Sequence, residues 1–62
     1  MKKLTYLITE GDETYGMEFI TDRTAKWTEQ QYMRHRTNIS MNFIGEEETE
    51  ETEGTARKVD LL

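Results

Sequence analysis

The chain has 62 residues, of which 34% are hydrophobic and 34% are charged, with no cysteine, no proline and a formal net charge of −5. A chain this short supports one small core, so we expect a single domain, and the lack of cysteine excludes disulfides, thiol catalysis and thiolate metal sites. No apolar run approaches the roughly 20 residues of a membrane-spanning helix, and residues 1–6 do not form a signal-peptide core, so we expect a cytoplasmic protein without membrane contact.

The first elements expected are two β-strands that form a hairpin. Apolar and aromatic residues recur at every second position over residues 4–8 and again over residues 15–19, which is typical of half-buried strands. The polar run Gly11-Asp12-Glu13-Thr14 between them has the length and composition of a hairpin turn. Gly16 lies inside the second strand, where a glycine indicates a bulge or the close approach of another segment, and of the two we favour the bulge, which would twist the strand.

A single helix is expected next, because the apolar residues between positions 21 and 37 change from alternation to helical spacing. We expect the helix to run from about Arg23 to Arg36. Thr28 is an alternative start, since residues 28–31 match a capping box. Asn38 is expected to end the helix by adopting a left-handed conformation.

A third strand is expected from Ile39 onward, where Ile39, Met41 and Phe43 recur at every second position. The predicted fold class is therefore α+β, a small antiparallel sheet of three strands with one helix packed on one face, in the order β-β-α-β. Eleven side chains are expected to form its core: Leu4, Tyr6, Ile8, Met17, Phe19, Trp27, Tyr32, Met33, Ile39, Met41 and Phe43.

The excess of acid lies at the C-terminal end. Residues 1–45 carry six basic and six acidic side chains, whereas residues 46–62 carry two basic and seven acidic ones, which gives −5. We therefore divide the chain into an α+β domain over residues 1–45 and an acidic segment over residues 46–62. This segment is expected to form either a flexible tail or a second hairpin. The hairpin would turn at Gly54, set Arg57 and Lys58 opposite the acids of the third strand, and extend the sheet to four or five strands.

No arrangement of residues predicts catalysis. His35 stands between Arg34 and Arg36 at the expected helix end, where positive charge complements the helix dipole, and Ser40 lies in an ordinary strand pattern. The glutamate run lacks the spacing and central glycine of a calcium loop, and the dispersed glycines form no phosphate loop. We therefore expect no enzymatic activity, no cofactor and no metal site.

The acidic segment is the strongest functional feature of the sequence. Alternate carboxylates on an extended strand recur about every 6.6 Å, close to the phosphate spacing of an extended nucleic-acid strand, so the segment could mimic nucleic acid toward a basic protein. In size and charge the chain resembles the accessory proteins with which phages and mobile elements inhibit host enzymes. We expect a small acidic protein-binding module, an inhibitor or regulator of a larger basic or nucleic-acid-handling protein. Its expected partner-binding residues are Glu46, Glu47, Glu48, Glu50, Glu51 and Glu53.

Two alternatives use other parts of the chain. Unpaired sheet edges could join two copies into a structural homodimer, which would complete a core too small for one copy. The weaker alternative is nucleic-acid binding, against which the acidic excess argues, because it repels phosphate. That alternative would use the basic residues Lys2, Lys3, Lys26, Arg34 and Arg36.

Overall fold

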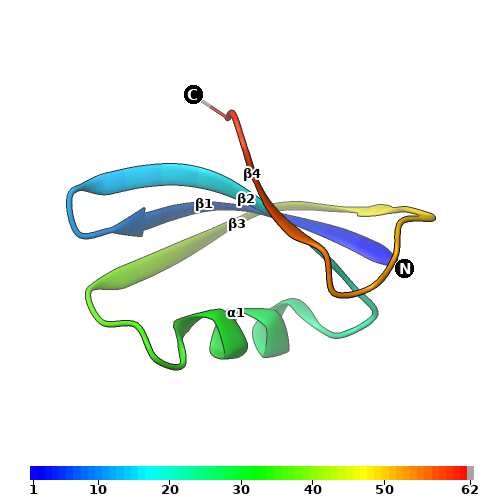
Figure 1. The fold of residues 1–62 in the computed structure, drawn as a ribbon, viewed down its shortest axis with the longest axis horizontal. Coiled ribbons are helices and arrows are strands. Elements are labelled where there is room, and N and C mark those ends of the chain that lie inside the picture. The colour runs from blue at the N-terminus through cyan, green and yellow to red at the C-terminus, as the bar shows by residue number, and fades with distance from the viewer. Residues whose placement is uncertain (62) are drawn as a thin grey trace.

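The computed structural model describes residues 1–61, which form four strands and one helix. In chain order these elements are β1 (Lys2–Glu10), β2 (Glu13–Thr21), α1 (Ala25–Met33), β3 (Ile39–Glu48) and β4 (Ala56–Val59). The strands form one antiparallel sheet in the order β3-β1-β2-β4, and α1 lies against one of its faces (Figure 1). The α+β class is confirmed. The expected order β-β-α-β describes the first four elements, and β4 adds a fourth strand.

The expected hairpin between β1 and β2 is confirmed. Glu10 pairs with Glu13, so only Gly11 and Asp12 connect the two strands. Gly11 has a φ of 61°, and glycine with positive φ at the first turn position is typical of a type II′ turn. The Gly11 N–H donates to the carbonyl oxygen of Asn38 over 3.0 Å, which ties the turn to the start of β3.

The hydrophobic core lies between α1 and the middle of the sheet. Leu4, Tyr6 and Ile8 on the central strand β1 are fully buried, and Met17 and Phe19 lie beside them on β2. Partly buried side chains from every other element except β4 pack against this cluster: Tyr15, Ala25, Tyr32, Ile39 and Met41. Five of the eleven expected core residues are therefore buried in the cluster, and three more pack against it.

The other three expected core residues do not belong to the core. Trp27 and Phe43 are 41% and 48% exposed, and Met33 is half-buried outside the cluster. Phe43 touches the ring of Tyr6 edge-on, with centroids 5.5 Å apart, but it lies on the outermost strand, where no further strand covers it. Its exposure therefore follows from the position of β3 at the edge of the sheet.

The exposure of Trp27 follows from the way α1 faces the sheet. The sheet-facing stripe of α1 has helical spacing and consists of Ala25, Thr28, Glu29 and Tyr32. The Tyr6 hydroxyl is held by this stripe, at 2.8 Å from a carboxylate oxygen of Glu29 and 3.2 Å from the carbonyl oxygen of Ala25. Trp27 is about 200° around the helix from Ala25 and about 100° from Thr28, so its ring lies outside the stripe, on the flank nearer Thr28.

The boundaries of α1 differ from the expected ones. Thr24 is the N-cap, and its Oγ1 accepts a hydrogen bond of 3.1 Å from the Trp27 N–H. The alternative start at Thr28 is wrong, because Thr28 is buried within the helix and its hydroxyl donates to the carbonyl oxygen of Thr24. The helix ends at Met33 rather than Arg36. Asn38 has the expected left-handed conformation, with a φ of 56°, but it stands at the start of β3 instead of closing the helix.

The C-terminal strand corrects the expected second hairpin. β4 pairs with β2 and lies at the opposite side of the sheet from β3. Arg57 therefore stands opposite Glu18 of β2 rather than opposite the acids of the third strand. Gly54 does lie in the turn before β4, with a φ of 92°. Gly45, the expected boundary of the acidic segment, lies inside β3, which continues to Glu48.

Two local features adapt the sheet to its neighbours. The ladder between β1 and β3 shifts register between Thr5 and Tyr6, and Ile44 is the extra residue of the resulting bulge. At Gly16 the favoured bulge is wrong, and the other alternative, the close approach of another segment, is confirmed. A Cβ at Gly16 would lie 2.7 Å from the carbonyl oxygen of Val59 on β4.

Candidate functional site

The six glutamates expected to bind a partner lie at one end of the sheet. Three of them end strand β3, and three stand in the connection from β3 to β4. In Figure 1 this connection passes beside the N-terminus, at the end of the sheet away from the β1–β2 turn. The N–H of Thr49 donates to the carbonyl oxygen of Met1 over 3.1 Å, so the start of the connection is attached to the residue that precedes β1.

Glu51 and Glu47 are engaged inside the molecule. Glu51 accepts two hydrogen bonds from the guanidinium of Arg57, of 2.6 and 2.9 Å, which lower the pKa of its carboxyl. Arg57 also donates from Nε to Glu18 over 3.0 Å, so the connection, β4 and β2 are joined through one guanidinium. Glu47 lies 3.7 Å from the ammonium of Lys3. Glu51 therefore joins the connection to β4, whereas Glu47 forms only an exposed ion pair with β1.

The other four glutamates are exposed, and their side chains make no hydrogen bond or ion pair with any residue from 1 to 61 that would neutralise them. They are Glu46, Glu48, Glu50 and Glu53. Glu46 and Glu48 point to the same side of β3, where alternate residues are about 6.6 Å apart. We call Glu46, Glu48 and Glu50 the free acidic residues. Glu53 belongs to a groove described below.

The free acidic residues continue the unpaired edge of β3. This strand has ten residues and pairs only with β1, so its outer backbone groups face no other described strand. Phe43 and the bulged Ile44 precede the acids, and Ile44 is 57% exposed. Sequence periodicity predicts that Phe43 is a core residue, and its exposure could not be predicted because it depends on the strand order of the sheet.

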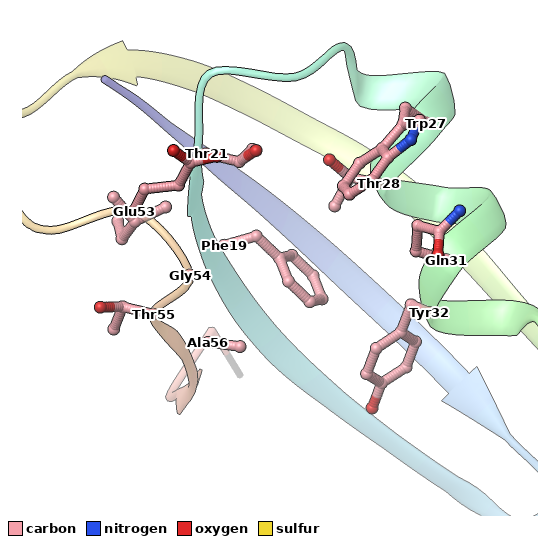
Figure 2. A pocket seen from close by; sticks show the side chains of 11 residues that line it. Phe19, Thr21, Trp27, Thr28, Gln31, Tyr32, Glu53, Gly54, Thr55 and Ala56 are labelled. Atoms are coloured by element: carbon pink, nitrogen blue, oxygen red, sulfur yellow. The ribbon is translucent and has the colours of Figure 1, made fainter.

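A groove of about 320 Å³ lies between α1 and the turn that precedes β4. Figure 2 shows the Phe19 ring between its two sides, with α1 on one side and the turn over residues 53–56 on the other. Its exposed surface is mostly apolar. Eleven residues line it: Phe19, Ile20, Thr21, Trp27, Thr28, Gln31, Tyr32, Glu53, Gly54, Thr55 and Ala56.

The polar groups of the groove fall into two sets. The Thr28 hydroxyl donates a hydrogen bond to the carbonyl oxygen of Thr24, and the Tyr32 hydroxyl shares one with the hydroxyl of Tyr15. The side chains of Trp27, Gln31 and Glu53 form no hydrogen bond with residues 1–61, and Glu53 is the only charged residue of the lining. The groove therefore offers an apolar floor with an unpaired carboxylate at one side.

A third cluster lies at the opposite end of the sheet and is structural. Glu10 accepts hydrogen bonds from the Tyr15 hydroxyl at 2.9 Å and from Arg36 at 3.1 Å, and both lower the pKa of its carboxyl. The Tyr32 hydroxyl lies 2.8 Å from that of Tyr15, and the Arg36 guanidinium stacks 4.3 Å from the Tyr32 ring centroid. Burial and these hydrogen bonds raise the pKa of Tyr15. The cluster joins the hairpin to the segment after α1.

The side chains of His35 and Ser40 form no hydrogen bond with residues 1–61. His35 is exposed beyond the end of α1, and Ser40 is exposed on β3. Within residues 1–61, no group of three or more histidine, aspartate or glutamate side chains is arranged to hold a metal ion. No helix in this part of the chain is both long and apolar enough to cross a membrane.

Comparisons with protein-family models, with curated proteins and with solved structures found no match for this chain.

Proposed function

We propose that this chain is a small protein-binding module that engages the basic surface of a larger protein, as an inhibitor or regulator. The observation that carries the proposal is the outer edge of β3, which is unpaired over ten residues and runs into acids without a partner. An extended segment of the partner adds to this edge as a further antiparallel or parallel strand, and the main-chain hydrogen bonds supply affinity.

Side chains on and after β3 contribute apolar contact and charge to the binding. Phe43 and Ile44 provide exposed apolar surface near the middle of the edge, where it is most easily desolvated. The free acidic residues lie at its C-terminal end and attract basic side chains, which raises the association rate and sets the direction of docking. The net charge of −5 adds long-range attraction to a basic partner.

The experiment compares capture of partner proteins from an extract of the native cells by the tagged wild type and by E46Q/E48Q/E50Q. The substitutions raise the formal net charge by three, from −5 to −2. We expect loss of a specific partner, and we expect salt to weaken the wild-type interaction. Circular dichroism is used to check that the variant is folded.

The matched control is D12N/E13Q/D22N, which changes the net charge by the same three units at exposed positions away from the β3 edge. Capture by the control at the wild-type level supports a local acidic surface. Equal loss from both triple variants would show that only net charge matters, and undiminished capture by E46Q/E48Q/E50Q would remove the proposal.

A second copy of the chain is the other candidate occupant of the β3 edge. The exposed Phe43 and Ile44 favour it, because antiparallel pairing of two β3 strands would cover both copies of these side chains. Light scattering over a range of concentrations decides between the two, since a monomeric mass throughout excludes the homodimer. Nucleic-acid binding has less support, because Lys3 and Arg36 are already paired with carboxylates.

A further inference from the structure

We propose that the groove between α1 and the 53–56 turn binds an arginine side chain of the partner. The inference rests on the proposed function, since it names the side chain through which a basic partner is recognised. It uses residues that are separate from the free acidic residues, so the two ideas can fail independently.

The floor and one side of the groove suit the apolar stem and planar head of arginine. Phe19 forms the floor, and Trp27 stands beside it on α1 with 41% of its surface exposed (Figure 2). An exposed tryptophan in a chain with only one is a strong anchor for a partner side chain. Indole faces attract guanidinium groups, and the Arg23 guanidinium already lies 5.1 Å from the Trp27 ring centroid.

The other side of the groove supplies the charge. Glu53 is its only charged lining residue, and its carboxylate has no partner among residues 1–61. The amide of Gln31, on the helix side, also forms no hydrogen bond with residues 1–61. A guanidinium carries five donors in a plane and can use both acceptors, whereas a lysine ammonium neither stacks on indole as well nor binds a carboxylate through two parallel bonds.

The acidic side of the groove is held in place before any ligand arrives. The Gly54 N–H donates to the carbonyl oxygen of Ile20, and the Ile20 N–H donates to that of Thr55, each over 2.8 Å. These two bonds fix the turn onto the end of β2, next to Phe19. Glu53 is the first residue of this turn, so its backbone needs little further ordering when a cation binds.

Titration with short blocked peptides tests the inference without the partner. Acetyl-Gly-Arg-Gly-amide is compared with the same peptide containing citrulline, the neutral isostere of arginine, and with the lysine peptide. Binding is followed by the fluorescence of Trp27, the single tryptophan, and by amide chemical shifts. We expect saturable shifts at groove residues, with a dissociation constant near or below about 1 mM and at least about tenfold weaker binding of citrulline.

Two variants locate the binding. E53Q should abolish the preference for arginine over citrulline, whereas E50Q, which removes an equally exposed charge outside the lining, should preserve it. W27A should lose the shifts at the groove. Equal binding of arginine and citrulline, shifts outside the groove, or no saturable binding would overturn the inference. If E46Q/E48Q/E50Q still binds the arginine peptide, loss of partner capture by that variant bears on the proposed function and leaves the groove inference standing.

Discussion

The packing of β4 on β2 depends on the absence of a side chain at Gly16. A Cβ built there would lie 2.6 Å from Cγ of Leu61 and 2.7 Å from the carbonyl oxygen of Val59, both closer than real Cβ contacts. The Leu61 side chain can rotate away. The Val59 carbonyl is backbone and belongs to the residue that pairs with Gly16, so relief requires β4 to move.

We therefore expect Gly16→Ala to destabilise the protein by about 1–3 kcal/mol, the usual cost of overpacking. In a domain of this size each 1 kcal/mol lowers Tm by roughly 4–8 °C. Thermal unfolding followed by circular dichroism measures the change, and amide hydrogen exchange shows whether β4 (Ala56–Val59) loses protection.

Gly45→Ala is the matched control for this substitution. Gly45 also lies in a strand, but a Cβ there would meet nothing within 4 Å. We expect its stability to equal or slightly exceed that of the wild type, because alanine loses less backbone entropy on folding. If Gly16→Ala keeps the wild-type Tm and the protection of β4, the close approach of the C-terminal segment is wrong.

Further predictions concern the core, a buried hydroxyl and pH. Phe19→Ala should lower the free energy of unfolding by about 3–5 kcal/mol, because Phe19 is buried in the core. Trp27→Ala should lower it by roughly 1–2 kcal/mol, because its exposed ring loses mainly a cation–π contact. Equal losses of stability in denaturant unfolding would place Trp27 in the core. Tyr6→Phe should cost about 1.5–3 kcal/mol, because its hydroxyl donates to a carboxylate on α1, and a loss below about 0.5 kcal/mol would argue against that bond. The pKa of Glu10 is lowered by the Tyr15 hydroxyl and a guanidinium, so its stabilisation is present above the ordinary carboxyl pKa of about 4.5 and is lost as pH falls through the lowered value. In acid unfolding, Tyr15→Phe should weaken this dependence, and an unchanged acid profile would contradict the assignment.

Local patterns predicted the first half of the fold. The alternation on both sides of Gly11 specified the hairpin, because turn chemistry and strand period act over a few residues. The glycine inside the second strand left a bulge and a close approach open, and the favoured bulge was the wrong choice, because the position of β4 beside Gly16 is set by long-range pairing. The helix was also predicted, but its start was not, since Thr24 and Thr28 both precede residues that fit a first turn.

Local sequence patterns could not predict the features that depend on tertiary arrangement. β4 pairs with β2 across 39 residues, between Glu18 and Arg57, and no local pattern specifies that partner. Phe43 has the period of a core residue, yet strand order leaves it exposed. Composition predicted that the glutamates of residues 46–53 form one surface. In the structure Glu47 and Glu51 are ion-paired within the protein, and the free acidic residues are not.

The exposure of Trp27 was the most informative departure from expectation. A large aromatic in a short chain is normally needed for the core. Its place relative to the sheet-facing stripe of α1 could have been found from helical spacing alone, because it is offset from both Ala25 and Thr28. The groove it lines requires the turn before β4, which only the three-dimensional structure supplies.

Site-specific photocrosslinking in the native cells tests the central claim most directly. A photoreactive phenylalanine derivative replaces Ile44 on the β3 edge in one variant and Asp12 in the β1–β2 turn in another, both at exposed positions. The account predicts a discrete adduct with a larger basic protein from position 44, weakened by E46Q/E48Q/E50Q, and none from position 12. Equal adducts from both positions, or none from position 44 in folded protein, would contradict a docking surface on β3.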